Sequence, residues 1–455
     1  MEWQGRRTLV FGAGRSGQAA VRKLQRLGAE VFLVDQKEFQ ELSGIEELGL
    51  DFEHLLLGKI PECQEVNPEL LVLSPGVSPH LKFVSDSLAA GIPVWSEVEL
   101  AMHDCSAMCI GITGTNGKTT TTTLIGELAQ RTGRPSIVAG NIGIAMSGRV
   151  ENLEDGIVVA ELSSFQLEFI TELRVEIAIM LNITPDHLDR HGTIENYVAV
   201  KARIFENQTD KDLAILNWDD PLVRGLSSKT LGRVIYFSPS SLLADGFGLK
   251  GDQIVYAQQG VVTPILARQE LQIRGSHNLE NVMAAAAAAK ELGLSWAEIA
   301  QGLRDFRGVE HRQENVGTYN GILFINDSKG TNTDAAERAV LAFEEPLVLI
   351  AGGKNKGLDF HDFMRVVSQR VKSLILLGQA AEEMENVARE VGVLRIIRAS
   401  SFADGVEKAI AEAMPGDVVL LSPACTSWDM FKSYEERGEL FKQLVRRHYK
   451  EPILR

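Results

Sequence analysis

Residues 108–131 read MCIGITGTNGKTTTTTLIGELAQR, and this stretch decides the fold class. The apolar run at residues 108–113 predicts a buried strand, and residues 120–131 predict a helix. Between them, residues 111–119 carry the glycines and the Lys-Thr pair of a phosphate-binding loop. A strand, a glycine loop and a helix in this order predict an α/β domain that binds a nucleotide.

The chemistry of this loop depends on its lysine and threonine. Glycines let the backbone fold tightly, so that N–H groups point at phosphate oxygens beside a helix N-terminus. Lys118 would neutralise the β- and γ-phosphates, and the hydroxyl of Thr119 would hold Mg2+. Ile112 occupies the place of the first glycine in the common pattern, so the competing interpretation is a glycine turn without a ligand. We expect ATP contacts from Gly114, Thr115, Asn116, Gly117, Lys118, Thr119 and Thr120.

Length and charge limit the class of protein. At 455 residues the chain exceeds one ordinary core, since a domain has ~150 residues. The net charge of −15 disfavours a nucleic-acid surface, which needs a basic footprint. The four cysteines lack metal-ligand spacing, and no apolar run reaches the ~20 residues that cross a bilayer. We expect a soluble, cytoplasmic monomer of about three domains, with no nucleic-acid or membrane partner.

The order of apolar runs predicts three α/β domains, at residues 1–97, 98–308 and 309–455. In the first domain, short apolar runs alternate with helical patterns such as residues 18–27, which is typical of a Rossmann-like parallel sheet. The second resembles a P-loop ATPase domain, and the third is again Rossmann-like. Further strands are predicted at residues 157–160, 175–181, 322–326, 347–351, 374–377 and 418–421, and a helix at 278–292.

A second glycine motif lies near the N-terminus. Gly12, Gly14 and Gly17 spell G-x-G-x-x-G between a strand and a helix, and Asp35 ends the next strand at the spacing of a ribose ligand. Taken alone, the motif indicates a nicotinamide dinucleotide. A nucleotide sugar also carries a diphosphate and a ribose, and close helix packing needs no ligand. The motif leaves these three interpretations open.

Polar residues follow two further predicted strands. Glu161 lies where ligands of open α/β sheets gather, and could hold Mg2+ opposite Thr119. His187 and His191 have helical i, i+4 spacing, so a zinc site is conceivable, although no third Cys or His ligand is evident. By spacing alone, Lys201 is an ordinary solvated lysine.

Motifs from all three domains resemble the Mur ligases of bacterial cell-wall synthesis. These are GITGTNGKTT, ELSSFQLE, NITPDHLDRHGTIENYVAVKARIF, GSHNLENVMAA, EHRQE, NDSKGTNTDA and SPACTSWDMFKSYEERG. Within that family, NDSKGTN and SPACTSWDMF resemble the member that adds D-glutamate to UDP-N-acetylmuramoyl-L-alanine, and the DNPR-type motif of the diaminopimelate- or lysine-adding relative is absent. The rivals are another Mur ligase, folylpolyglutamate synthetase, a dehydrogenase and a non-catalytic ATPase or switch.

The resemblance implies an ATP-dependent amide ligase of peptidoglycan precursor synthesis. The L-alanyl carboxylate would attack the γ-phosphate of ATP, and the amine of D-glutamate would then displace phosphate from the acyl phosphate. Catalytic roles are implied for Lys118, Glu161, His187 and Lys201. If Lys201 is carbamylated, it would join Glu161 and His187 around a second Mg2+, beside the first ion at Thr119.

The resemblance also implies binding residues. The UDP-substrate would contact Gly14, Arg15, Ser16, Asp35, Ser74 and Gly76, with Asn141 and His187 near the reacting carboxyl group. The nucleotide of ATP would also meet Asn278, Arg312 and Asp327. D-Glutamate would meet Lys329, Thr331, Lys356, Ser427 and Tyr434. Tyr434 stands where relatives often carry Phe, and Lys354 lies in a loop that is usually more acidic.

Overall fold

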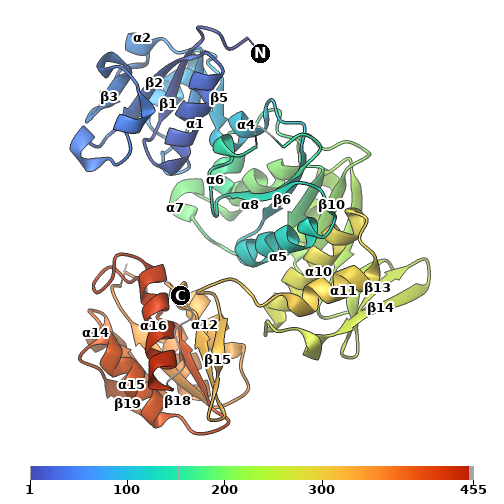
Figure 1. Ribbon diagram of the computed structural model, residues 1–455, viewed down its shortest axis with the longest axis vertical. Helices are drawn as coiled ribbons and strands as arrows, with labels where there is room; N and C mark the ends of the chain where they lie inside the picture. The colour runs from blue at the N-terminus through green and yellow to red at the C-terminus, as the bar shows by residue number, and fades with distance from the viewer. Residues whose placement is uncertain (1, 151–152, 356, 450–455) are drawn as a thin grey trace. The chain divides into compact units, whose positions relative to one another are not determined.

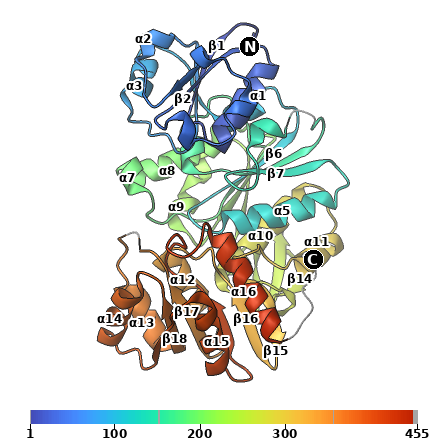
Figure 2. The same ribbon diagram turned by 60° about the vertical axis from the view of Figure 1, so that its left-hand side comes forward.

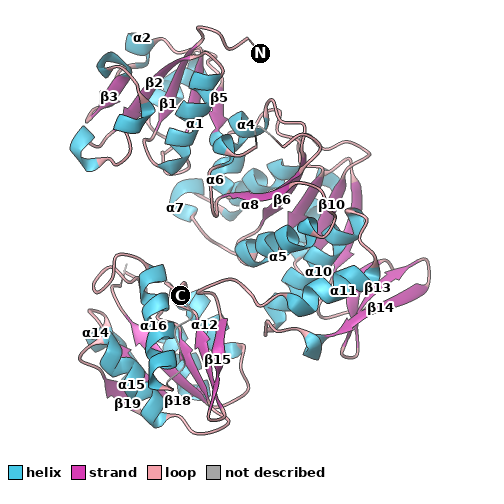
Figure 3. Ribbon diagram, viewed as in Figure 1, coloured by secondary structure: helices cyan, strands magenta, loops and turns pink. Residues whose placement is uncertain are grey.

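The computed structural model describes residues 2–150, 153–355 and 357–449. Strands and helices alternate along the chain and form three sheets with flanking helices (Figure 1; Figure 3). The chain divides into two units, one of Met1–Arg268 with Glu280–Leu303 and one of Gln269–Leu279 with Arg304–Arg455. The first unit holds two sheets and the second holds one. The predicted α/β class is therefore confirmed.

The N-terminal sheet is parallel throughout, in the order β3-β2-β1-β4-β5. Its inner strands are apolar and buried, as expected for a sheet covered on both faces. The chain order reverses between β1 and β4, so a ligand crevice is expected beyond their carboxyl ends. The elements are β1 (Arg7–Phe11), α1 (Arg15–Arg26), β2 (Glu30–Asp35), β3 (Leu55–Leu57), α2 (Cys63–Val66), β4 (Leu70–Leu73), α3 (Lys82–Ala89), β5 (Val94–Ser96) and α4 (Glu97–Met102).

The central sheet has nine strands in the order β14-β13-β12-β11-β10-β9-β6-β8-β7. Strand β6 lies between β8 and β9 and is parallel to both, so the loops after these strands share one edge of the sheet. The strands are β6 (Met108–Thr113), β7 (Ser136–Gly140), β8 (Ile157–Glu161), β9 (Ile177–Met180), β10 (Leu213–Asn217), β11 (Arg233–Phe237), β12 (Gly246–Lys250), β13 (Gln253–Gln258) and β14 (Val261–Ala267).

Strands β12, β13 and β14 are antiparallel to one another in sequence order and lie at one end of this sheet. The sequence patterns did not predict them. Their partly exposed sequences lack the continuous apolar runs that mark the parallel strands. The helices of the central region are α5 (Lys118–Gln130), α6 (Ser164–Leu167), α7 (Leu188–His191), α8 (Ile194–Ala202), α9 (Pro221–Arg224), α10 (Ser276–Glu291) and α11 (Trp296–Asp305).

Helix α5 begins two residues before its predicted start. Gly117 precedes it as the N-cap residue with φ of +84°, a left-handed conformation that glycine adopts at little cost. Lys118 and Thr119 consequently lie in the first helical turn, where backbone N–H groups and the helix dipole favour an anion.

The C-terminal sheet has the order β15-β16-β20-β17-β18-β19, in which only the β15–β16 pair is antiparallel. Helices α12, α13 and α14 pack on one face, and α15 and α16 on the other (Figure 2). Strands β16 and β20 have the predicted limits, while β17 and β18 are slightly longer. The elements are β15 (Glu314–Tyr319), β16 (Ile322–Asn326), α12 (Thr333–Leu341), β17 (Leu347–Gly352), α13 (His361–Arg370), β18 (Val371–Leu377), α14 (Ala381–Glu390), β19 (Ile396–Arg398), α15 (Phe402–Glu412), β20 (Val418–Leu421) and α16 (Tyr434–His448).

Candidate active site

The phosphate loop joins β6 to α5 and is held by the loop that follows β9. Asn182 accepts a hydrogen bond from the Asn116 N–H through its side-chain oxygen (2.8 Å) and one from the Thr115 N–H through its carbonyl (2.9 Å). The Lys118 ammonium donates to the carbonyls of Gly114 (3.0 Å) and Thr115 (2.8 Å), folding back over the loop. The predicted loop residues therefore form one local structure with a cation above it.

Thr119 and Glu161 come together across neighbouring strands. The Thr119 hydroxyl donates to one carboxylate oxygen of Glu161 (2.9 Å), and the Asn141 amide donates to the other (2.8 Å). Thr119 and Glu161 are both buried. Hydroxyl and carboxylate oxygens are the ligands that Mg2+ prefers, so this pair fits a magnesium site beside the phosphates. Asn141 lies at this carboxylate and is absent from the lining of the N-terminal pocket described below.

Lys201 is buried below the loop. Its ammonium donates to the carbonyl of Gly114 (2.8 Å) and to the hydroxyl of Thr113 (3.3 Å), and lies 4.7 Å from the ring centroid of Tyr197. Burial, together with the nearby charge of Lys118, lowers the pKa of Lys201 well below its ordinary value. The interpretation from spacing alone, a solvated lysine, is wrong, because α8 turns this side chain into the core.

The two histidines of the HLDRH segment differ in exposure, although both lie against the Phe165 ring. The half-exposed His187 has φ of +52° and lies 4.8 Å from the Phe165 ring. The buried His191 shares a hydrogen bond with the Ser164 hydroxyl (3.0 Å). In the described part of the chain, the histidine–carboxylate clusters close enough to share an ion are Asp51–Glu53–His54 and Glu310–His311–Glu439. Neither includes His187 or Glu161.

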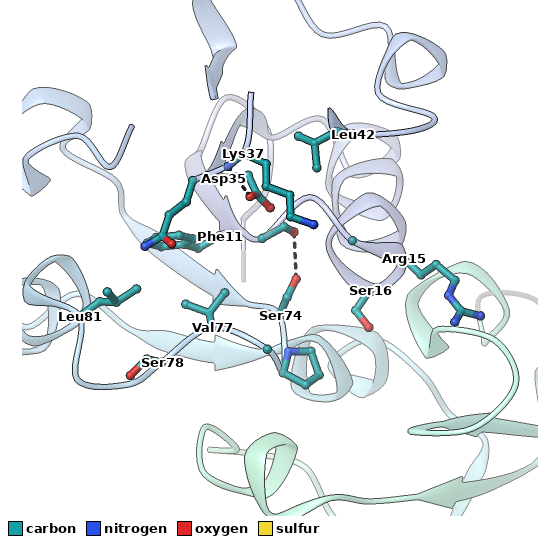
Figure 4. Close-up of a pocket in the computed structure, with 15 residues that line it drawn as sticks. Phe11, Arg15, Ser16, Asp35, Lys37, Leu42, Ser74, Val77, Ser78 and Leu81 are labelled. Carbon is teal, nitrogen blue, oxygen red and sulfur yellow. Dashed lines mark hydrogen bonds between the residues drawn. The ribbon is translucent and has the colours of Figure 1, made fainter. Parts of the chain in front are cut away.

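A cavity of about 640 Å³ lies beyond the carboxyl ends of β1 and β4 (Figure 4). Six predicted UDP-substrate residues line it: Gly14, Arg15, Ser16, Asp35, Ser74 and Gly76. The Ser74 hydroxyl donates to the carbonyl of Gly12 (2.9 Å), which joins the two loops across the strand switch. A Cβ at Gly17 would lie 1.7 Å from that same carbonyl, so the third glycine of the motif serves close helix packing.

The carboxylate of Asp35 is hydrogen-bonded to the backbone of the pocket. Its two carboxylate oxygens accept the N–H groups of Ala13 (2.7 Å) and Lys37 (2.9 Å). Figure 4 shows Lys37 beside Asp35, and both residues line the cavity together with Ser74. Lys37 was missed by the sequence analysis. Its position in the sequence, two residues after the aspartate that ends a strand, could have indicated a cation near the ligand.

In the second unit, Asp327 directly follows β16 and is buried. Its carboxylate accepts hydrogen bonds from the Ser422 hydroxyl (2.7 Å) and the Gln313 N–H (3.2 Å). Burial raises the pKa of Asp327 to about 7, against the opposing effects of Ser422 and Arg312. Arg312 also contributes to lowering the pKa of His277 to about 4, where burial is the largest cause. The neighbouring Asn278 donates to the carbonyl of Arg274 (2.6 Å).

Two predicted D-glutamate residues meet in the same unit. The Lys329 ammonium lies 5.4 Å from the ring centroid of Tyr434, and the Ser328 hydroxyl donates to the Tyr434 carbonyl (2.8 Å). Arg437, which the sequence analysis missed, is buried and donates to the carbonyls of Ser328 (2.8 Å) and Cys425 (3.3 Å). This guanidinium ties the NDSKGTN segment to the SPACTSWDMF segment.

The remaining acceptor-side predictions have simpler surroundings. The Thr331 N–H donates to the Lys329 carbonyl (2.8 Å), and Ser427 is buried at the start of a turn. Lys354 pairs through its backbone with Thr426 (3.0 Å). Lys356 lies outside the described residues.

Among the described residues, no helix has the length and apolar character needed to span a membrane.

The first unit holds a glycine loop with the lysine and threonine typical of phosphoryl transfer, and a separate cavity at the carboxyl ends of β1 and β4. These features fit the class of α/β enzymes that use a nucleoside triphosphate. Family models match most of the chain: the MurD-like N-terminal domain of Mur ligases at residues 6–96, the Mur ligase middle domain at 112–289 and the Mur ligase glutamate ligase domain at 311–425. The chain belongs to the Mur ligase family, as its motifs predicted.

Curated relatives are similar to this chain over nearly its full length. A protein of Desulfitobacterium hafniense (strain Y51), named UDP-N-acetylmuramoylalanine--D-glutamate ligase, is 67% identical over 98% of this chain and 99% of its own. A protein of the same name from Pelotomaculum thermopropionicum is 47% identical over 97% of each chain. These identities extend across all three sheets.

Solved structures show the same fold at low identity. The UDP-N-acetylmuramate-alanine ligase MurC of Thermotoga maritima superposes with a TM-score of 0.59 at 17% identity, covering 97% of this chain and 99% of that one. The MurF ligase of Thermotoga maritima, solved in complex with ADP, gives a TM-score of 0.58 at 16% identity, covering 98% and 96%. At such identities the likeness concerns the fold alone.

Proposed function

We propose that this chain is an ATP-dependent ligase that joins D-glutamate to UDP-N-acetylmuramoyl-L-alanine during peptidoglycan precursor synthesis. The observation that carries the proposal is the 67% identity to a relative named for this reaction, over 98% of the chain. The two sites of the first unit suit the two nucleotide substrates. The phosphate loop suits ATP, and the cavity at β1 and β4 suits the UDP-substrate.

Forming an amide from a carboxylate requires a better leaving group than oxide. Transfer of the γ-phosphoryl group to the L-alanyl carboxylate supplies one as an acyl phosphate, which the D-glutamate amine then attacks. Catalysis of phosphoryl transfer consists mainly of positioning and charge stabilisation. Lys118, already folded over its own loop, supplies a cation for the transferring group.

Members of this family depend on Mg2+, which would neutralise charge on the phosphate groups during transfer. We propose that Thr119 and Glu161 hold one ion, since their buried oxygens already face each other. A second ion would take Glu161, His187 and a carbamylated Lys201 as ligands. The depressed pKa of Lys201 supports the modification, because the neutral amine is the form that reacts with carbon dioxide.

The binding roles outside the loop are also proposals. Gly14, Arg15, Ser16, Asp35, Ser74 and Gly76 contact the UDP-substrate, with Asn141 and His187 near its reacting carboxyl group. Asn278, Arg312 and Asp327 contact the nucleotide of ATP. Lys329, Thr331, Lys356, Ser427 and Tyr434 contact D-glutamate. Each role is carried over from the family motif at that position.

We further propose that the enzyme works in the cytoplasm as a monomer, with domain limits at residues 1–97, 98–308 and 309–455. Its substrates are ATP, the UDP-substrate and D-glutamate, all small polar molecules. The domain limits place the change from the first to the second domain at the start of α4, and the change to the third in the segment before β15.

Phosphate release by the purified protein tests the proposed function. The assay contains ATP, Mg2+ and UDP-N-acetylmuramoyl-L-alanine, with either D- or L-glutamate. We expect release only with D-glutamate, and a product heavier by one glutamyl residue. Phosphate release that does not depend on the added amino acid would indicate a simple ATPase. Phosphate release with L-glutamate but not with D-glutamate would contradict the proposed acceptor.

A further inference from the structure

We propose that Arg190 is a positioning residue, which fixes the loop at residues 74–78 of the UDP-substrate pocket relative to the segment that carries His187. The inference rests on the proposed function, because it concerns the UDP-substrate. Arg190 lies in α7 of the central region, whereas the loop follows β4 in the N-terminal sheet. Both belong to the first unit of the structure.

The guanidinium of Arg190 is divided between two partners. One of its terminal nitrogens donates to the carbonyls of Pro75 (3.3 Å) and Val77 (3.0 Å). The other terminal nitrogen and Nε donate to a single carboxylate oxygen of Glu168 (2.7 and 3.1 Å). Only 11% of the Arg190 side chain is exposed, so water screens these contacts weakly. Arginine suits this arrangement because its donors form a rigid planar fork.

The contacts to Pro75 and Val77 determine the direction of the loop's N–H groups. In a trans peptide the carbonyl and the following N–H point in opposite directions. The N–H groups of Gly76 and Ser78 therefore point away from the guanidinium, and both residues line the cavity. Within the described residues neither N–H has a hydrogen-bond partner. They form a pair of donors for a diphosphate on the side of the cavity where Figure 4 shows Ser74, Val77 and Ser78.

On its other side, Arg190 contacts the catalytic segment. Its guanidinium lies 4.1 Å from the ring centroid of Phe165, and the same ring lies 4.8 Å from that of His187. A second link runs from the carbonyl of Arg190 to the Nε2 atom of His80, just after the pocket loop (3.3 Å). Arg190 thus touches both the wall of the nucleotide-sugar pocket and the aromatic support of His187.

This arrangement predicts a specific kinetic defect. Without the guanidinium, the Pro75 and Val77 carbonyls lose their donor, and the Gly76 and Ser78 N–H groups lose their fixed direction. We expect Arg190→Met to raise the KM for the UDP-substrate and the Kd for UDP about 10- to 100-fold, the size of a lost charge-assisted contact. The KM values for ATP and D-glutamate should change by no more than about twofold. Arg190→Lys should resemble Arg190→Met, since one ammonium cannot reproduce the fork.

Arg174→Met is the matched control. Arg174 makes a two-pronged pair with the buried Asp212 (2.7 and 3.0 Å) in the same unit, and neither residue lines the cavity. Thermal unfolding of this variant measures how much stability is lost when a similar ion pair is broken. We expect its KM for the UDP-substrate to equal that of the wild type. UDP binding to each full-length variant is measured by calorimetry.

Equal KM and Kd values in wild type and both Arg190 variants would overturn the inference. So would a uniform loss of activity, matched by Arg174→Met, that leaves UDP binding intact. A wild-type enzyme without D-glutamate-dependent phosphate release would refute the proposed function instead. The UDP titrations would then still decide the role of Arg190, because they require no turnover.

Discussion

The hydroxyl of Thr119 donates a 2.9 Å hydrogen bond to the carboxylate of Glu161, and both side chains are buried. Thr119 follows β6 and Glu161 ends the neighbouring strand β8, so the parallel register brings them to one edge of the sheet. Glu161 is also held by Asn141. Its oxygens are therefore oriented toward the phosphate loop before any substrate binds.

We expect Glu161→Gln to lower kcat by about 100-fold or more, because a neutral amide binds Mg2+ far more weakly than a carboxylate. The amide has nearly the same shape, and its NH2 group can donate to the Thr119 hydroxyl, which can accept as well as donate, so thermal unfolding should change little. Steady-state kinetics across a Mg2+ titration provide the measurement, and a higher requirement for the ion should accompany the lower rate. A variant with wild-type Mg2+ dependence would remove Glu161 from the metal site.

Lys201→Ala should lose about 100-fold or more in activity if a carbamate is the functional group. A short carboxylic acid such as acetate, added to the assay, should restore part of the rate by occupying the vacated space. Ammonium or alkylamines at the same concentration serve as the control, since they replace a cation rather than a carboxylate. Rescue by the amine, or an unimpaired variant, would show that Lys201 acts unmodified or not at all.

Gly117→Ala should raise the KM for ATP and destabilise the protein. Gly117 has φ of +84°, and an added Cβ would lie 2.3 Å from the side-chain oxygen of Asn281. Gly133→Ala is the matched control, because Gly133 has φ of +74° with open space around it. Both variants should lose about 1 kcal/mol from backbone strain. Only Gly117→Ala should change ATP kinetics, and a similar change in both would argue against a local effect.

Glu99→Gln should lower the free energy of unfolding by about 2–4 kcal/mol. The buried Glu99 carboxylate accepts the N–H groups of Thr171 (2.9 Å), Glu172 (2.7 Å) and Leu173 (3.0 Å). The glutamine NH2 group would oppose at least one of these donors. Urea unfolding measures the difference. The exposed Glu407→Gln should change stability by no more than about 0.5 kcal/mol, and equal effects would contradict the assignment.

Asp327 should make stability fall as pH rises from about 4 to about 7. Its folded pKa is raised from 3.8 to about 7, so the native state binds more protons than the unfolded chain in this window. Each pH unit across the window should reduce the contribution of Asp327 by up to about 1.4 kcal/mol. The difference between wild type and Asp327→Asn, measured by urea unfolding at several pH values, isolates this residue. A difference that does not change with pH would refute the raised pKa.

Local sequence patterns predicted those strands that consist of an unbroken run of apolar residues. The apolar runs of β6, β16 and β20 occur at the predicted limits, because a strand buried on both faces is recognisable from its own residues. The hairpin strands β13 and β14 were missed, since their partly exposed residues follow no such run. The zinc interpretation of His187 and His191 finds no support, because no cluster of metal-ligand atoms among the described residues includes either side chain.

The sequence by itself determined the nucleotide loop and the family, because the glycines, Lys118 and Thr119 act as close neighbours along the chain. Tertiary structure decided which distant groups meet. The parallel register places Glu161 against Thr119, helix α8 buries Lys201, and α7 carries Arg190 to the carbonyls of Pro75 and Val77. These contacts join residues separated by tens to more than a hundred positions, and their geometry depends on strand order and burial, which no local pattern records.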